Sequence, residues 1–392
     1  MAQSACLRAD AMTRQLLGEP LAIRGTTLSN RIVMSPMTRG FCPRGAPTEQ
    51  VCSYYSRRAA GGFGLVITEA IGVDHRSALG DAGLGEDDIP VLHGEAPLAG
   101  WRRVVEAVHA AGGKIIPQLW HQGVMRLPGT GPHPEAPTLG PSGLWGPLRR
   151  TTSIDAGKIP SQPLIGEPMS EQDIEDVIEA HVRSARNAIQ AGFDGIAIHG
   201  GHGYLIDTFL WEETNRRTDR WGGNRARRSA FAAEIVHRIR AAIGPNLPIF
   251  FRFSQWKQQD FRAQLGNTPQ ELADVLQPLA DAGVDVFDAS VRYFDRPAFS
   301  GSDLSLAGWA KKLTGKHAMA VGGVGVNKGM YDGNSNLSAV DNVDAVVKRV
   351  SSGEIDLVAV GRAAIGDPAW ARKSLAGDTA EPFDPASLAE LR

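Results

Sequence analysis

The sequence predicts an α/β fold of the (β/α)8 type, in which parallel strands close into a barrel and helices cover it. Short apolar runs alternate with longer stretches whose apolar residues recur at helical spacing, and eight such alternations can be counted in the 392 residues. In addition, no Gly-x-Gly-x-x-Gly motif follows the first apolar run, although the dinucleotide crevice of an open doubly wound sheet would require one.

The apolar runs are the expected strands. They lie at residues 31–35, 65–67, 114–119, 196–198, 248–253, 284–289, 317–321 and 357–360. Glycines or polar side chains follow most of them, at what would be the carboxyl ends of the strands. Because side chains at those ends face the ligand in barrels of this kind, we expect the functional site there.

The stretches between the strands carry signals for the ends of helices. Ser170 and Asp173 have the pattern of a capping box, and Asn224 is placed to cap the helix before the fifth strand. Pro278 is expected to kink or shorten the helix that begins at Thr268, because proline lacks the N–H of a helical hydrogen bond.

One long stretch interrupts the alternation. Residues 123–166 are rich in Pro, Gly, Ser and Thr and are too long for an ordinary connection, so we expect a cap inserted after the third strand. The whole chain, 1–392, is expected to be one barrel domain with a core at about residues 28–376 and a loose start.

Composition narrows the class of protein. Hydrophobic residues make up 42% of the chain and charged residues 21%, as in ordinary soluble proteins, and no apolar run reaches the roughly 20 residues of a membrane span. The start lacks a basic segment followed by an apolar core, so a cytoplasmic location is expected. Cys6, Cys42 and Cys52 lack the spacing of a metal cluster and are interpreted as thiols.

The charge distribution argues against nucleic acid as a partner. The formal net charge is -2, and a single basic run, residues 215–228, contains six arginines. Glu212, Glu213 and Asp219 lie within or beside that run. We therefore predict a solvated loop of paired charges there.

Glycines follow the last two expected strands. Gly322 and Gly323 come after the seventh strand, and Gly361 and Arg362 after the eighth, where barrels of this kind commonly hold phosphate. Backbone N–H groups and a guanidinium both suit phosphate oxygens, so we favour a ligand that carries phosphate. In the alternative interpretation the glycines only turn the chain and Arg362 pairs with Asp367.

Two histidines and a tyrosine follow the fourth expected strand. His199, His202 and Tyr204 could bind a metal, pack as structural residues or donate hydrogen bonds to a substrate oxygen. Metal is the weakest interpretation, because neither an HExxH motif nor a cysteine pair supplies a third ligand nearby. Imidazoles aimed at a carbonyl would stabilise the charge that develops on its oxygen, and a tyrosine could supply a proton.

Two further polar residues lie within apolar runs. Arg252, at the end of the fifth strand, requires an anionic partner such as a carboxylate or an anionic ring, since an unpaired buried guanidinium is too costly. Gln118 has an amide that suits the edge of a flat heterocycle. Polar pairing in the core is an equally good explanation for each of them.

Several motifs together resemble the Old Yellow Enzyme family of flavin-dependent ene-reductases. They are NRIVMSPMTR, GLVITEA, QLWHQG, HGGHGYLIDTFL with NRRTDRWGG, and DLVAVGRAAIGDP, and the match runs from about Leu28 to Trp370. The resemblance implies a barrel that holds FMN noncovalently, is reduced by NAD(P)H and is reoxidised by a small activated alkene. It also implies cofactor contacts at Pro36, Met37, Thr38, Ala70, Gln118, Arg252, Gly322, Gly323, Gly361 and Arg362.

The resemblance also assigns substrate residues. His199 and His202 would hold the substrate's carbonyl or nitro oxygen, and Tyr204 would protonate the α carbon after flavin N5 delivers hydride to the β carbon. Trp120 and Phe294 would line the pocket, although the aromatic ring of Phe294 is equally consistent with core packing.

The sequence departs from parts of the family and leaves alternatives open. Position 202 is His where many relatives have Asn, and position 38 is Thr where one branch has Cys. No cysteine follows Cys52, so we do not expect the iron-sulfur cluster and second flavin domain of some relatives, and we expect no metal site at the histidines either. An FMN-dependent oxidative N-demethylase, a flavin-free barrel lyase or isomerase for a phosphorylated substrate, and a homo-oligomeric state all remain open.

Overall fold

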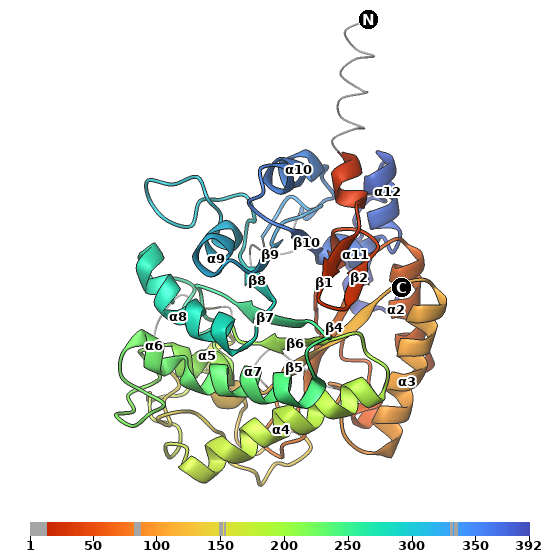
Figure 1. Cartoon of the computed structure of the whole chain (residues 1–392). Helices are drawn as coiled ribbons and strands as arrows, with labels where there is room; N and C mark the ends of the chain where they lie inside the picture. Colours follow the sequence, from red (N-terminus) through yellow and green to blue (C-terminus); the bar gives the residue numbers. More distant parts are fainter. Residues whose placement is uncertain (1–13, 82–87, 149–151, 153, 330–331, 333–335) are drawn as a thin grey trace, which may run out of the picture.

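A closed barrel of parallel strands forms the centre of the molecule (Figure 1). The computed structural model describes residues 14–81, 88–148, 152, 154–329, 332 and 336–392. The strand order is β10-β3-β4-β5-β6-β7-β8-β9, so the predicted fold class is confirmed. The barrel strands are β3 (Ile32–Met34), β4 (Leu65–Gly72), β5 (Ile115–Trp120), β6 (Ile196–His199), β7 (Ile249–Phe253), β8 (Val286–Ser290), β9 (His317–Val321) and β10 (Leu357–Val360).

The strands agree closely with the apolar runs of the sequence. β9 and β10 have the predicted bounds, and β10 pairs with β3 in the register Val358↔Ile32, which closes the barrel. β4 ends at Gly72 rather than at Ile67, because polar Thr68 and Glu69 continue the strand with their side chains buried.

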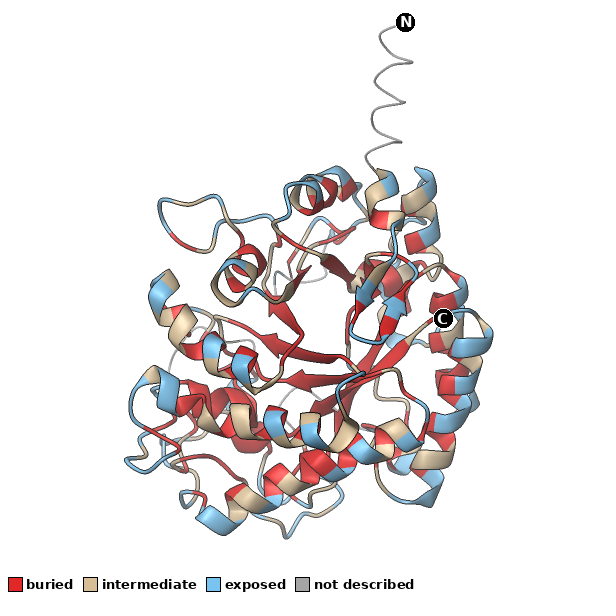
Figure 2. Ribbon diagram, in the orientation of Figure 1, coloured by how far each residue is buried: buried red, intermediate tan, exposed pale blue. Residues whose placement is uncertain are grey.

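Helices surround the strands, with buried residues toward the barrel and exposed residues toward solvent (Figure 2). They are α2 (Glu49–Ala60), α3 (Glu95–Ala110), α4 (Glu171–Gln190), α5 (Leu205–Leu210), α6 (Arg225–Arg228), α7 (Ala230–Ile243), α8 (Pro269–Ala282), α9 (Leu306–Thr314), α10 (Val343–Ser351), α11 (Arg362–Gly366) and α12 (Trp370–Ala376). None of the helices described combines the length and the apolar character that a membrane crossing requires.

The predicted capping box is confirmed, whereas the predicted cap at Asn224 belongs to a different helix. Ser170 and Asp173 form a complete capping box at α4, but the side chain of Asn224 caps the short α6, and α7, the helix before β7, begins after Ser229. Pro278 does not shorten α8, which continues to Ala282. The helix tolerates the missing N–H because a row of leucines on its inner face, including the fully buried Leu276, packs against the barrel.

A hairpin that the sequence did not reveal closes the amino end of the barrel. Its strands are β1 (Leu21–Ile23) and β2 (Thr26–Leu28). Ile23 and Leu28 belong to the same hydrophobic cluster as the side chains inside the barrel. The hairpin turn is bonded to residues just before β6 and β7, through Thr26 Oγ1 to the Asp194 carbonyl and the Gly25 N–H to the Asn246 carbonyl.

The expected cap lies over the opposite end. Within the part of 123–166 that is described, Leu144 pairs with Leu164 in an antiparallel bridge, and the fully buried Arg126 donates to four backbone carbonyls. The side chain of Gln259, after β7, donates to the Trp145 carbonyl. The cap therefore adjoins the loops at the carboxyl ends of the strands.

Candidate active site

The histidines and tyrosine that the sequence singled out lie together at the carboxyl end of β6. His199 is the last residue of this strand, and His202 and Tyr204 follow in the turn before α5. The ring centroid of His199 lies 5.0 Å from that of His202 and 5.1 Å from that of Tyr204. Trp120, at the end of β5, packs edge-on against Tyr204 with a centroid distance of 4.8 Å. Four of the predicted substrate residues thus form one cluster.

His202 has a backbone conformation that residues other than glycine rarely adopt. Its φ is 65°, which costs on the order of 1 to 3 kcal/mol. Its N–H donates to Ser254 Oγ at 2.9 Å, its ring stacks on Trp256 with centroids 4.3 Å apart, and its Nε2 lies 2.8 Å from Ser290 Oγ. The loop after β7 and the last residue of β8 therefore hold the imidazole in place.

Burial keeps both imidazoles neutral at ordinary pH. It lowers the pKa of His199 to about 3, with a smaller contribution from the Arg252 guanidinium. Burial and the neighbouring His199 also lower the pKa of His202 well below its usual value. The N–H of Gly201 donates to Nδ1 of His199, so the proton of that neutral ring lies on Nε2. His199 can therefore donate a hydrogen bond to a substrate oxygen.

Arg252, on β7, has the carboxylate partner that its burial requires. Its Nε donates to Asp288 Oδ2 at 2.6 Å, and one terminal nitrogen donates to Ser35 Oγ at 3.1 Å. The side chains of Arg252 and Asp288 are 6% and 2% exposed. A guanidinium has five N–H donors, so these bonds leave donors for a further acceptor.

Gln118 carries a buried donor that no described residue satisfies. Its side chain lies on β5 in register with Ala70, and the residue is 2% exposed. No described side chain or backbone group accepts a hydrogen bond from its Nε2. Leaving such a donor unpaired costs about 1 to 3 kcal/mol, so a ligand with an acceptor edge would stabilise the protein here.

A glutamate that the sequence did not mark as functional holds the loop after β3. Glu69, on β4, is 1% exposed, and its Oε2 accepts the backbone N–H groups of Arg39 at 2.9 Å and Gly40 at 3.0 Å. The Tyr55 hydroxyl lies 3.5 Å from its other oxygen. Burial raises the pKa of Glu69 to about 7. The carboxyl group thus fixes the chain directly after Thr38.

The predicted cofactor residues after β3 approach the turn after β10. Pro36 is buried, Met37 half-buried and Thr38 exposed. A Cβ added to Gly361 would lie 3.5 Å from the sulfur of Met37. The structure therefore brings residues that are more than three hundred positions apart in the sequence to one side of the barrel mouth.

The glycines predicted to bind phosphate lie at the ends of neighbouring strands. Gly322 and Gly323 follow β9, Gly361 follows β10, and the two strands pair in parallel. The φ of Gly322 is 136°, and a Cβ there would lie 2.1 Å from the Val291 carbonyl oxygen, so only glycine fits. The N–H of the buried Phe294 donates to the Gly322 carbonyl, which places the backbone of this aromatic residue beside these glycines.

Arg362 does not pair with Asp367. Its guanidinium donates to the Lys328 carbonyl, whereas Asp367 accepts from Lys373 Nζ at 2.9 Å. The alternative interpretation of Arg362 is therefore wrong. Arg362 is half-buried and is the first residue of α11, directly after Gly361.

The segment after β7 contains partners that sequence reasoning missed. Gln258 Nε2 donates to the Tyr204 hydroxyl oxygen at 2.7 Å. Lys257 Nζ donates to Asp207 Oδ1 at 2.8 Å, and both of these side chains are 0% exposed. Burial lowers the pKa of Lys257 and raises that of Asp207, and each charge opposes the shift of the other. The polar stretch 254–260 carries no pattern that could have indicated these contacts.

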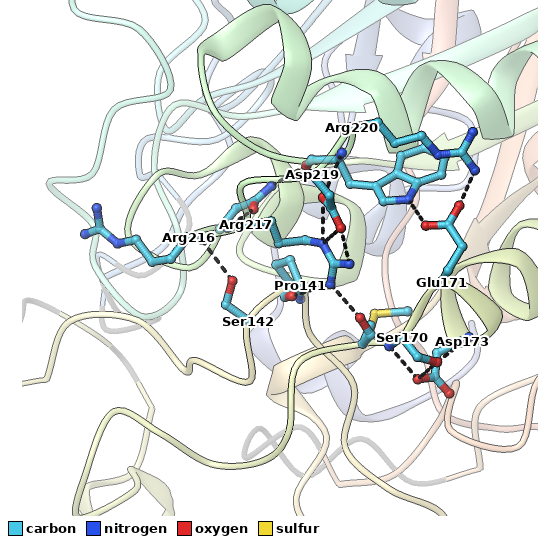
Figure 3. Close-up of polar contacts among 12 residues, drawn as sticks. Pro141, Ser142, Ser170, Glu171, Asp173, Arg216, Arg217, Asp219 and Arg220 are labelled. Carbon is cyan, nitrogen blue, oxygen red and sulfur yellow. Dashed lines mark hydrogen bonds and ion pairs between the residues drawn. The ribbon is translucent and has the colours of Figure 1, made fainter.

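The charges of the arginine-rich run are paired, as predicted (Figure 3), but the run is not a loop throughout, because its last residues form α6 (Arg225–Arg228). Arg217 pairs with Asp219 and donates to the Pro141 carbonyl of the cap, and Arg220 pairs with Glu171 at the start of α4. The other arginines of the run also have acidic or carbonyl partners: Arg216 with Glu213, Arg225 with Glu271, Arg227 with the Asp219 carbonyl and Arg228 with Glu212. The run joins the cap to α4 beside the site.

Known proteins resemble this chain along most of its length. The sequence pattern of the NADH:flavin oxidoreductase / NADH oxidase family matches residues 16–379. An NADH oxidase of Thermoanaerobacter brockii is 33% identical over 360 residues, which are 91% of this chain and 50% of the relative. The 12-oxophytodienoate reductase 2 of Arabidopsis thaliana is 35% identical over 240 residues, 61% of each protein. The chain thus spans between half and about three fifths of the length of these relatives.

A solved structure agrees with the fold. The old yellow enzyme homologue from Zymomonas mobilis superposes with a TM-score of 0.75 at 25% sequence identity, over 95% of this chain and 96% of that protein. The chain belongs to the NADH:flavin oxidoreductase / NADH oxidase family, the Old Yellow Enzyme family of FMN-dependent oxidoreductases.

Proposed function

We propose that this protein uses NAD(P)H and FMN to reduce the activated C=C bond of α,β-unsaturated carbonyl or nitro compounds. The observation that carries the proposal is the convergence of two neutral imidazoles, His199 and His202, with the phenol of Tyr204 at the carboxyl end of the barrel. This set can bind an oxygen and deliver a proton beside it. Membership of the family supports the flavin and the nicotinamide reductant.

Hydrogen-bond donors that are still available at this end of the barrel fit FMN. The unpaired amide of Gln118 and the remaining donors of Arg252 suit the carbonyl-bearing edge of a flavin ring. The glycine backbone after β9 and β10 suits phosphate oxygens. By this proposal the ring would lie along Pro36, Met37, Thr38 and Ala70, and the phosphate would be held by Gly322, Gly323, Gly361 and Arg362.

The histidines bind and orient the substrate. When it is bound and reduced by NAD(P)H, FMN would supply the hydride for the β carbon of the alkene. Negative charge then develops on the carbonyl or nitro oxygen, to which His199 and His202 donate hydrogen bonds. Hydrogen bonds to charged groups contribute about 1.5 to 3 kcal/mol each, and neutral imidazoles provide them without repelling the Arg252 guanidinium.

Tyr204 completes the reaction by giving its hydroxyl proton to the α carbon, so that the hydride and the proton together convert C=C to CH–CH. General acid catalysis of this kind contributes about a hundred- to ten-thousand-fold. The Gln258 amide donates to the same oxygen and stabilises the negative charge that remains on it. The edge-on contact with Trp120 limits rotation of the ring.

The first test follows the flavin absorbance. FMN-loaded protein is reduced anaerobically with NADPH and mixed with 2-cyclohexenone, and we expect the oxidised spectrum to return while cyclohexanone forms. Tyr204→Phe should slow this reoxidation about a hundredfold or more, with a much smaller effect on flavin reduction. Equal slowing of both half-reactions would exclude Tyr204 as the acid. Flavin that stays reduced in the presence of enones and nitroalkenes would contradict the proposed reaction.

A further inference from the structure

The segment after β7 forms hydrogen bonds to backbone groups of His202 and Gly203, which lie in the turn after β6. Ser254 Oγ accepts the N–H of His202 at 2.9 Å, and the N–H of Gln258 donates to the His202 carbonyl at 3.1 Å. The side chain of Gln259 donates to the Gly203 carbonyl at 3.0 Å. Hydrogen bonds with residues 254–259 thus hold the backbone conformation of the turn that carries His202.

A fully buried ion pair fastens these two segments. Lys257 Nζ donates to Asp207 Oδ1 at 2.8 Å and to the Ser254 carbonyl at 3.2 Å. The second oxygen of Asp207 accepts the N–H of Gly203 at 2.7 Å. The two side chains are 0% exposed. Lys257 therefore connects β7 to the turn after β6 through a single carboxylate.

Stability alone does not account for this pair. Apolar residues of similar size usually replace a buried ion pair without loss of stability, because desolvation offsets the attraction between the charges. The turn, in contrast, needs external support, since His202 has a φ of 65°, which residues other than glycine rarely adopt. The carboxylate supplies that support with directional bonds that apolar packing does not provide.

We infer that Lys257 is a positioning residue of the active site, which acts through Asp207 to hold the turn that carries His202, so that this imidazole can bind an oxygen anion. The inference rests on the proposed function, because it takes the two imidazoles to be donors to the substrate oxygen. Lys257 itself lies behind the turn and contacts Asp207 and the Ser254 carbonyl.

The test uses 4-nitrophenol as a probe, since its phenolate carries charge on oxygen as the reduced substrate does and its absorbance reports ionisation. In titrations of the oxidised, FMN-loaded protein, the wild type should bind the phenolate and lower the apparent pKa of the bound probe. Lys257→Met should weaken binding about tenfold or more and reduce that shift. Lys311→Met removes another Lys–Asp pair, a partly exposed one between Lys311 on α9 and Asp356 at 2.8 Å, and should change neither quantity.

A double variant distinguishes a loss of positioning from two other causes of weak probe binding, namely misfolding and the change in electric field when one charge is removed. Lys257→Met combined with Asp207→Leu leaves no unpaired buried charge, so it should fold with wild-type FMN content and unfold at a higher urea concentration than the single variant. We expect it to bind 4-nitrophenol as weakly as the single variant. Wild-type affinity and pKa shift in this folded double variant would overturn the inference alone. A wild-type protein that binds no phenolate would overturn the proposed role of the histidines, and the inference with it.

Discussion

At the scale of single residues, burial sets the chemical state of the groups at the carboxyl end of the barrel. It keeps His199 and His202 neutral, so each ring has one donor and one acceptor nitrogen throughout the ordinary pH range. It also raises the pKa of Glu69 to about 7, which is within that range. The loop after β3 is therefore held by a group whose charge changes near neutral pH.

Glu69→Gln should change how stability depends on pH. A carboxyl group whose pKa is raised on folding, here from 4.5 to about 7, stabilises the protein fully below the lower value. That stability is lost as pH rises toward about 7, and the loss is on the order of 3 kcal/mol. The amide of Gln does not titrate, so the variant should lose less stability between pH 5 and pH 8. Urea unfolding of the FMN-loaded protein at both pH values measures the difference.

Glu106→Gln is the matched control for this prediction, because Glu106 is exposed on α3. Its unfolding midpoints should follow those of the wild type at both pH values. An identical pH dependence for Glu69→Gln and the wild type would mean that Glu69 ionises freely in the folded protein.

The sequence revealed those residues of the site whose chemical type and position in the sequence indicate a functional role. His199, Tyr204 and Arg252 are polar groups at the ends of apolar runs, so their place at the barrel mouth followed from the strands. Lys257 carries no such signal, because its role depends on Asp207, a partner 50 positions away. Pairings of that kind arise only from the folded arrangement of neighbouring loops.

At the scale of secondary-structure elements, the β1–β2 hairpin shows what local patterns omit. Its strands are three residues long, and the chain before β3 reads as a loose start. Ile23 and Leu28 are nevertheless buried, at 2% and 1% exposure, because the open amino end of the barrel receives them. Residues at that end of such barrels contribute stability, whereas those at the carboxyl end carry function.

Leu28→Ala should therefore reduce stability and spare activity. Removing a buried leucine side chain costs about 2 to 5 kcal/mol, which urea unfolding would detect. The rate of flavin reoxidation by 2-cyclohexenone should stay at the wild-type value below the unfolding transition. Thr27→Ala, an exposed neighbour on the same strand, should change neither property. A loss of activity in folded Leu28→Ala protein would show that the two ends of the barrel are coupled.

At the scale of the whole molecule, the parallel barrel was predictable because its strands are buried on both faces and read as uninterrupted apolar runs. The position of the cap was not, since polar segments without periodicity give no contact information. Its place over the loops after β7 became visible only through contacts such as that of Gln259 with the Trp145 carbonyl.

The site draws on strands from around the barrel, so binding of FMN should stabilise the entire fold. At a free FMN concentration of a hundred times Kd, the gain is about 2.7 kcal/mol, which for a chain of this length raises the melting temperature by about 3 °C. Arg362→Met should lose about half of that rise or more at the same FMN concentration, because a charge-assisted phosphate contact contributes about tenfold or more to Kd. Riboflavin lacks the phosphate and should stabilise the wild type and the variant equally. Equal FMN-induced shifts for both proteins, measured by thermal unfolding, would place the phosphate away from Arg362.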